Sequence, residues 1–138
     1  MTTETTARAS FAERLSEIEE AYEFMLAYAA QGHPRGVEGD HIRRYLERAS
    51  AALDRIGEAA TAAAAAGGVD ASAFRAVAAL LEEDARKAQA GLRLALAQHA
   101  ISSQLIDNLN ASIHLRALLT DLFLIDEAVG IGSGGSPG

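Results

Sequence analysis

The side chain that most needs a chemical partner is Arg116. It lies in the segment Leu115-Arg-Ala-Leu-Leu119, where a helix would surround its guanidinium with apolar groups. A buried guanidinium needs an anion, because leaving it unpaired in a low-dielectric interior costs several kcal/mol. We therefore predict that Arg116 is mostly buried and meets a carboxylate, with Asp84 as the first choice. Two alternatives stay open: a ligand carboxylate or phosphate as the anion, and exposure of Arg116 at the rim of an interface.

Other polar side chains near Arg116 suggest a ligand site. On a helix, Asp107, Asn110 and His114 would follow one narrow polar stripe, because they are spaced by three or four residues. One interpretation is thus a helical carrier or enzyme that binds a small anionic ligand or a metal around Arg116, His114 and Asp107. The candidate ligand-binding residues are Arg116, His114, Asp107, Asn110 and Asp84.

The segment Ile113-His-Leu-Arg-Ala-Leu-Leu-Thr120 resembles the His-x-Leu-Arg phosphoacceptor region of sensor-kinase dimerisation helices. The resemblance covers about eight residues. It implies histidine phosphotransfer, in which an exposed imidazole nitrogen of His114 attacks a phosphoryl group. Here the residue that separates the histidine from the leucine is missing, as is the neighbouring acid that helps to activate the histidine. The other interpretation of His114 is a histidine on a polar helix stripe.

Metal-ligating residue types gather between the first two predicted helices. Helical di-iron proteins carry Glu-x-x-His on two helices, and the one match here, Glu38-Gly-Asp-His41, falls across a glycine-rich loop. Together with His33 and Asp40 it would form at most an adventitious site for a divalent ion. We therefore expect no cofactor and no functional metal. Without a complete catalytic set, the sequence favours a protein that is not an enzyme.

Composition narrows the classes of partner and compartment. The chain has 138 residues, a formal net charge of -7 and no cysteine, which excludes disulfides and thiolate metal sites. Excess negative charge repels phosphate backbones, so we expect no nucleic acid partner. The N-terminus does not read as a signal peptide, and no run of about 18 uncharged apolar residues would span a membrane. Together with abundant alanine and one lysine against many arginines, this suggests a bacterial cytoplasmic protein.

Four arginines interleaved with acids are interpreted as a solvated helix face: Arg43, Arg44, Arg48 and Arg55.

Apolar residues at helical spacing must position all of these side chains. The periodicity predicts helices over 10–31, 40–66, 71–98 and 102–128, with no strands. Expected N-terminal caps are Ser10 in a capping box with Glu13, then Asp40, Asp70 or Ser72, and Ser102. The predicted fold is all-α, an antiparallel four-helix bundle with disordered ends. It divides into a disordered lead (1–9), a single helical domain (10–129) and a Gly/Ser-rich tail (130–138).

The predicted fourth helix carries very little charge. Between Ala100 and Ile125 the acidic and basic residues are Asp107, Arg116 and Asp121. Its leucines and isoleucines form two separate arcs, and one of them needs a partner outside a lone bundle. The leading interpretation is therefore a non-enzymatic interaction protein, regulatory or accessory to another protein, that acts as a homodimer. The candidate interface residues are Asn108, Ser112, Leu115 and Leu122, although the inner arc cannot be chosen from sequence.

Overall fold

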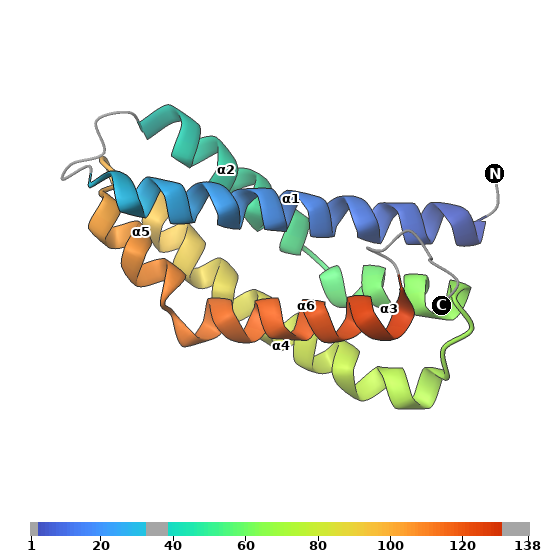
Figure 1. Ribbon diagram of the computed structural model, residues 1–138. Helices are drawn as coiled ribbons and strands as arrows, with labels where there is room; N and C mark the ends of the chain where they lie inside the picture. Colours follow the sequence, from blue (N-terminus) through green and yellow to red (C-terminus); the bar gives the residue numbers. More distant parts are fainter. Residues whose placement is uncertain (1–2, 33–38, 131–138) are drawn as a thin grey trace.

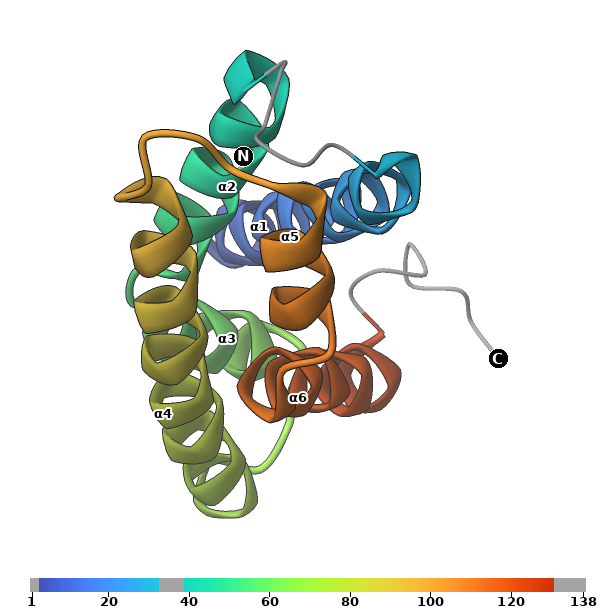
Figure 2. The same cartoon turned by 90° about the vertical axis from the view of Figure 1, so that its left-hand side faces the viewer.

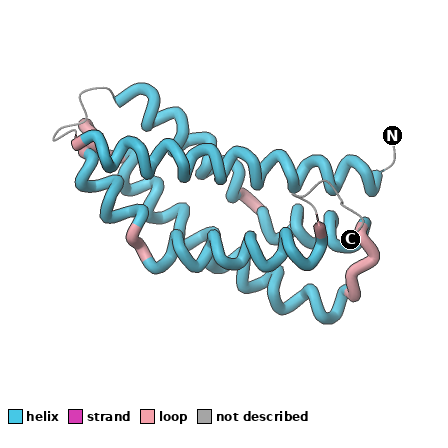
Figure 3. Tube along the Cα trace, in the orientation of Figure 1, coloured by secondary structure: helices cyan, strands magenta, loops and turns pink. Residues whose placement is uncertain are grey.

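The computed structural model describes residues 3–32 and 39–130, and the described residues form helices with no strand (Figure 1; Figure 3). The all-α class predicted from the sequence is confirmed. Some predictions concern residues 33–38 or 131–138 and lie outside the described residues. They include those for His33, Glu38 and most of the tail. The helices are α1 (Thr3–Gln31), α2 (Gly39–Leu53), α3 (Ile56–Ala66), α4 (Ala71–Leu96), α5 (Ser103–Asn110) and α6 (Ile113–Val129).

Two of the predicted helices, 10–31 and 71–98, correspond to single helices, α1 and α4. Asp70 caps α4 as predicted, because its carboxylate accepts a hydrogen bond from the Ala73 N–H at 3.0 Å. Ser102 likewise caps α5, accepting from the Leu105 N–H at 3.1 Å. The predicted cap at Ser10 is wrong, because α1 begins at Thr3 and Ser10 lies inside it. Asp40 also lies inside its helix, one residue after the start of α2.

The predicted helix 40–66 is broken between Leu53 and Ile56. At this break Arg55 adopts left-handed backbone angles, φ 55° and ψ 33°. Side chains from other helices hold the exposed backbone groups. Arg14 of α1 donates to the carbonyls of Ala52 and Asp54, at 2.8 and 2.6 Å. Gln89 of α4 donates at 2.7 Å to the Asp54 carboxylate, so the break is stabilised from two sides.

The predicted helix 102–128 is also two helices, separated at Ala111 and Ser112. The Ser112 hydroxyl accepts hydrogen bonds from the N–H groups of His114 and Leu115, at 3.1 and 3.4 Å, and thereby starts α6. Serine suits this position because its side chain satisfies backbone donors that a new helix leaves open. The prediction of a single long fourth helix is therefore wrong. Ser112 sets where α6 begins and thus which of its residues face inward.

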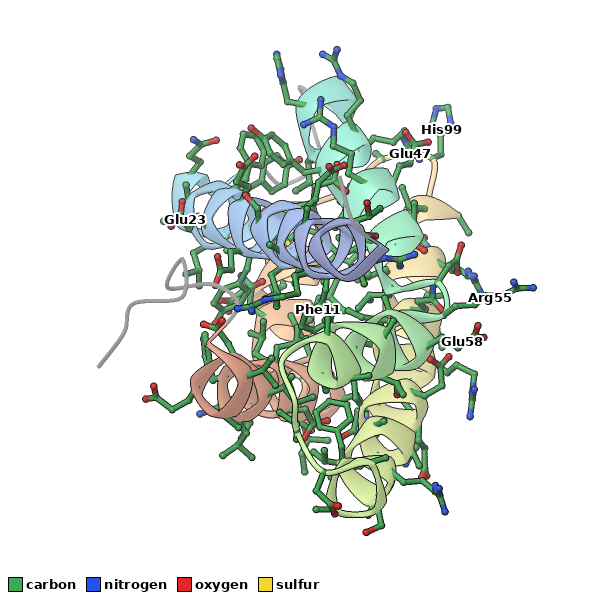
Figure 4. All side chains as sticks on the ribbon, turned by 90° about the vertical axis from the view of Figure 1, so that its right-hand side faces the viewer. Phe11, Glu23, Glu47, Arg55, Glu58 and His99 are labelled. Atoms are coloured by element: carbon green, nitrogen blue, oxygen red, sulfur yellow. The ribbon has the colours of Figure 1, made fainter. Side chains whose placement is uncertain are left out.

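The helices pack around one core to which all six contribute. Helix α1 packs against α2, α3 and α5, whereas α4 packs against α2, α3 and α6. Figure 2 shows α6 and α4 side by side, and in Figure 1 they run in opposite directions. Figure 4 shows Phe11 beneath α1, pointing into this interior. The largest fully buried side chains are Phe11, Met25, Ile42, Leu46, Leu53, Ile56, Leu81, Leu92, Ile101, Ile106, Leu118 and Ile125.

Candidate functional site

Arg116 is exposed, so the prediction that it is buried against Asp84 is wrong. Because α6 starts afresh at Ser112, its inner side is taken by leucines and by Ile125, and Arg116 is left on the outer side. No carboxylate among the described residues forms an ion pair with the Arg116 guanidinium. The exposure of Arg116 agrees with that part of the alternative in which it lies at the rim of an interface.

Asp84 faces a second acid, Asp121, which lies between Thr120 and Leu122 on α6. The side chain of Asp121 is buried, with 5% of the residue exposed, and Asp84 is half-buried. The carboxyl group of Asp84 is near enough to act on that of Asp121, both as a hydrogen-bonding group and through its negative charge. No N–H or hydroxyl group of the described residues reaches the buried Oδ2 atom of Asp121.

The environment of this pair favours the protonated acid. Burial, followed by the hydrogen bond from Asp84 and by its negative charge, raises the pKa of the Asp121 carboxyl to about 7. At pH 7 Asp121 is therefore about half protonated, and the pair carries between one and two negative charges. Asp121 was named from the sequence as one of the few charged residues between Ala100 and Ile125 but was not selected as a site residue. The available signal was an acid placed among Leu122, Phe123 and Leu124.

Exposed apolar side chains lie along α4 and α6 on either side of the acid pair in the sequence of each helix. Leu80 lies one turn before Asp84 on α4, and Leu124 lies one turn after Asp121 on α6. At the other end of the two helices, Leu94 lines the same hollow as the first turn of α6. We call this surface the α4–α6 face and define it by Leu80, Leu94, Ile113 and Leu124 with the Asp84–Asp121 pair between them. All four apolar residues are exposed.

A hollow of about 350 Å³ lies along the α4–α6 face, next to the break between α5 and α6. Gly91 of α4 lines the hollow, and a Cβ atom there would lie 3.0 Å from the side chain of Leu109 on α5, so a glycine allows the close approach of α4 and α5. Lys87 and His114 also line the hollow. Lys87 pairs with Glu83 at 3.9 Å, and both side chains are half exposed. The hollow thus adds polar groups to a mainly apolar face.

The predicted interface residues do not gather on one outer surface. Leu115 and Leu122 are buried in the core of their own chain. The prediction that they contact a second chain is therefore wrong, because they lie on the inner arc of α6. Ser112 is the N-cap of α6, and Asn108 is exposed on α5. The outer arc of α6 includes Ile113 and Leu124 instead, because the new helix start at Ser112 determines which side of α6 faces inward.

Asp107 and Asn110 belong to a different place, the junction of α5 with α1. Asn110 is buried and donates from Nδ2 to the Met25 carbonyl at 3.2 Å, while its Oδ1 atom has no partner among the described residues. Ser103 donates to the Tyr28 carbonyl at 2.7 Å. Asp107 is exposed and lines, with Asn110, an open hollow of about 620 Å³. These bonds fasten α5 to α1, and the five predicted ligand residues do not form one pocket.

His114 lies in the first turn of α6 and is exposed. Its backbone N–H is bonded to the Ser112 hydroxyl at 3.1 Å. The residue is thus at a helix start, next to the hollow that Lys87 borders, rather than in the middle of a long helix.

Neither similarity to known proteins nor a recognisable metal site assigns a function to these surfaces. No protein family, no curated protein and no solved structure that was compared with the chain matches it. Within residues 3–32 and 39–130, no three His, Asp or Glu side chains gather as a metal site. None of the helices in that part of the chain combines the length and apolarity that crossing a membrane requires.

Proposed function

We propose that the protein is a non-enzymatic helical interaction protein, regulatory or accessory to another protein, that forms a homodimer through the α4–α6 face. One observation carries the proposal. Among the described residues, six large apolar side chains are exposed, and five of them lie on α4 or α6: Leu80, Leu94, Ile113, Phe123 and Leu124. Clustered exposed apolar groups on a small domain mark a contact surface more often than scattered ones do.

The electrostatics of the face favour a second copy as its occupant. The chain has a formal net charge of -7, so two copies repel one another over most of their surfaces. On the α4–α6 face the raised pKa of Asp121 lowers the negative charge of the acid pair, and Lys87 pairs with Glu83. The exposed Arg116 adds a positive charge on α6. A nearly neutral apolar patch is where two like-charged molecules meet at the lowest electrostatic cost, and a twofold contact buries the same patch on both.

The remaining expectations are proposals of the same kind. We propose that α2 with α3, and α5 with α6, each take the place of one long helix in an antiparallel four-helix bundle. We also propose a cytoplasmic location and no nucleic acid partner. Ligand binding around Arg116, His114 and Asp107 loses support, because these side chains belong to different surfaces.

Sedimentation of a matched pair of variants tests the homodimer. Leu80 on the α4–α6 face and Leu26 on α1 are leucines of nearly equal exposure, 48% and 47%. We expect the unmodified chain and Leu26→Glu to sediment at twice the monomer mass of 14.4 kDa at tens of micromolar, and Leu80→Glu to sediment as a monomer. Helicity by circular dichroism should be the same for all three. An unmodified protein that sediments as a monomer at this concentration refutes the proposal, as does a dimer that Leu80→Glu leaves intact and Leu26→Glu splits.

A further inference from the structure

A small basic hollow lies on the exposed side of α2, away from the α4–α6 face. It has a volume of about 160 Å³ and is lined by His41, Arg44, Tyr45 and Arg48. They are linked by spacings of three and four positions, from 41 to 44 and 45 and from these to 48, so they share one face of the helix. Every one of the four carries a hydrogen-bond donor, and none of the residues that line the hollow is an acid.

The two arginines of the hollow have no acidic partner among the described residues. The ion pairs there are made by Arg86, Lys87 and Arg93, all on α4. Arg44 and Arg48 lie one turn apart, an arrangement in which like charges repel and weaken a helix. Figure 4 shows Glu47 on the side of α2 that faces His99. An anion between the two guanidinium groups would remove this repulsion.

The third arginine of α2 shows by contrast what a structural arginine does here. Arg43 donates from Nη1 to the Leu96 carbonyl at 2.7 Å and from Nη2 to the Gln98 carbonyl at 2.9 Å. It therefore closes the C-terminal end of α4. Within the described part of the chain, Arg44 and Arg48 donate no such hydrogen bond to a backbone carbonyl.

Aromatic stacking holds one side of the hollow in place. The ring of Tyr45 lies on that of Phe24, with centroids 4.3 Å apart and planes 16° from parallel. The guanidinium of Arg48 lies over the Tyr45 ring, 5.8 Å from its centroid. A tyrosine and an arginine that are already ordered lose less conformational entropy when a ligand binds.

We propose that this hollow binds a phosphate group, either inorganic phosphate or the phosphate of a small phosphomonoester. Two guanidinium forks offer paired N–H donors that match phosphate oxygens, and the Tyr45 hydroxyl and a His41 ring N–H supply further donors. A volume of about 160 Å³ holds one such group but is below the roughly 300 Å³ of a pocket that encloses a whole cofactor. The inference is independent of the homodimer.

Binding of inorganic phosphate to the full chain tests this site. Titration calorimetry and amide NMR would be run at pH 7 with the ionic strength held constant by sodium chloride. We expect saturable binding at millimolar phosphate or below, with amide shifts concentrated in residues 41–48. Arg44→Gln and Arg48→Gln should each weaken binding about tenfold or more, whereas Arg75→Gln, an exposed arginine on α4, should leave it unchanged.

Each result supports or overturns the site. Absence of saturable binding, or equal weakening by Arg75→Gln, overturns it, because the attraction would then be absent or merely a matter of total charge. Acetate at the same ionic strength separates a phosphate site from a general anion site, and equal affinity for acetate overturns the assignment to phosphate. A second titration with glycerol 3-phosphate distinguishes the two phosphate sources: tighter binding than inorganic phosphate favours a phosphomonoester, and weaker binding favours the free ion. Circular dichroism of the variants checks that α2 is still folded.

Discussion

At the scale of single residues, Asp121 is the group whose protonation the fold controls. Its pKa of about 7 lies above the ordinary value of 3.8, because burial and the neighbouring Asp84 disfavour the ionised form. Between about pH 4 and pH 7 the folded chain therefore holds a proton that the unfolded chain has released. In this window the free energy of unfolding falls as the pH rises, by at most about 1.4 kcal/mol per pH unit. The contribution is fully present below pH 4 and is lost above pH 7.

Asp121→Asn should remove this dependence. The amide has the shape of the acid and can donate to the Asp84 carboxylate without a shared proton. We expect urea unfolding to show similar stabilities for the variant and the unmodified chain near pH 4.5. By pH 8 the variant should be more stable, by about 3 kcal/mol. Asp107→Asn, at an exposed acid, is the control and should track the unmodified chain at both pH values. A pH-independent difference between Asp121→Asn and the unmodified chain would contradict the assignment.

At the scale of helices, the sequence predicted where segments begin and end better than where they break. The ends at Gln31 and Ala66 and the start of α4 at Ala71 follow from glycines and from the Asp70 cap. The break at Arg55 could not be predicted from periodicity, because residues 40–66 have a continuous apolar stripe. It depends on Arg14 and Gln89, which come from other helices and meet the break only in the folded chain. Tertiary contacts there override local helix propensity.

Arg55→Gly should stabilise the chain. A non-glycine residue in left-handed backbone angles costs about 1 kcal/mol, and glycine adopts them without that cost. Part of the gain is offset by the greater freedom of glycine in the unfolded chain, so we expect a net gain of about 0.5 kcal/mol in the free energy of unfolding. Arg75→Gly, at a right-handed position inside α4, should instead lose about 1 kcal/mol. Urea denaturation measures both, and destabilisation by Arg55→Gly would show that its side chain matters more than its backbone.

At the scale of the whole molecule, the predicted site failed where it depended on helix register. Asp84 was selected as the partner of Arg116 and instead meets Asp121. The low charge of residues 100–125 indicated excess apolar surface, and Ile113, Phe123 and Leu124 are exposed. The sequence alone could not show that Ser112 restarts the helix. That restart turns Leu115 and Leu122 inward, Arg116 outward, and Asp121 toward Asp84. A site made by two helices depends on the rotation of each, which the packing of the whole chain determines.

The acid pair also links the proposed homodimer to pH. Asp121 is already buried, but Asp84 is half-buried, so association through the α4–α6 face covers the remaining exposed part of Asp84. Two negative charges become less favourable there, which raises the pKa of Asp121 further. As the pH rises above 7 the second charge develops on both copies, so we expect the dimer dissociation constant to increase between pH 6 and pH 8.5. The increase should approach tenfold per pH unit for each proton taken up on association, and the limit is two protons, one on each copy. His114 and Lys87 border the same face, so the imidazole of His114 must be tested separately.

Sedimentation equilibrium at pH 6 and pH 8.5 measures this linkage. Asp121→Asn should form a dimer whose dissociation constant is nearly independent of pH, whereas His114→Gln should retain the dependence of the unmodified chain. If His114→Gln abolishes it and Asp121→Asn does not, the imidazole is the linked group. A dimer of constant affinity contradicts the linkage but not the homodimer, and a monomer at both pH values contradicts the homodimer itself. The two ideas therefore fail separately, because one depends on where the chains meet and the other on which proton is held there.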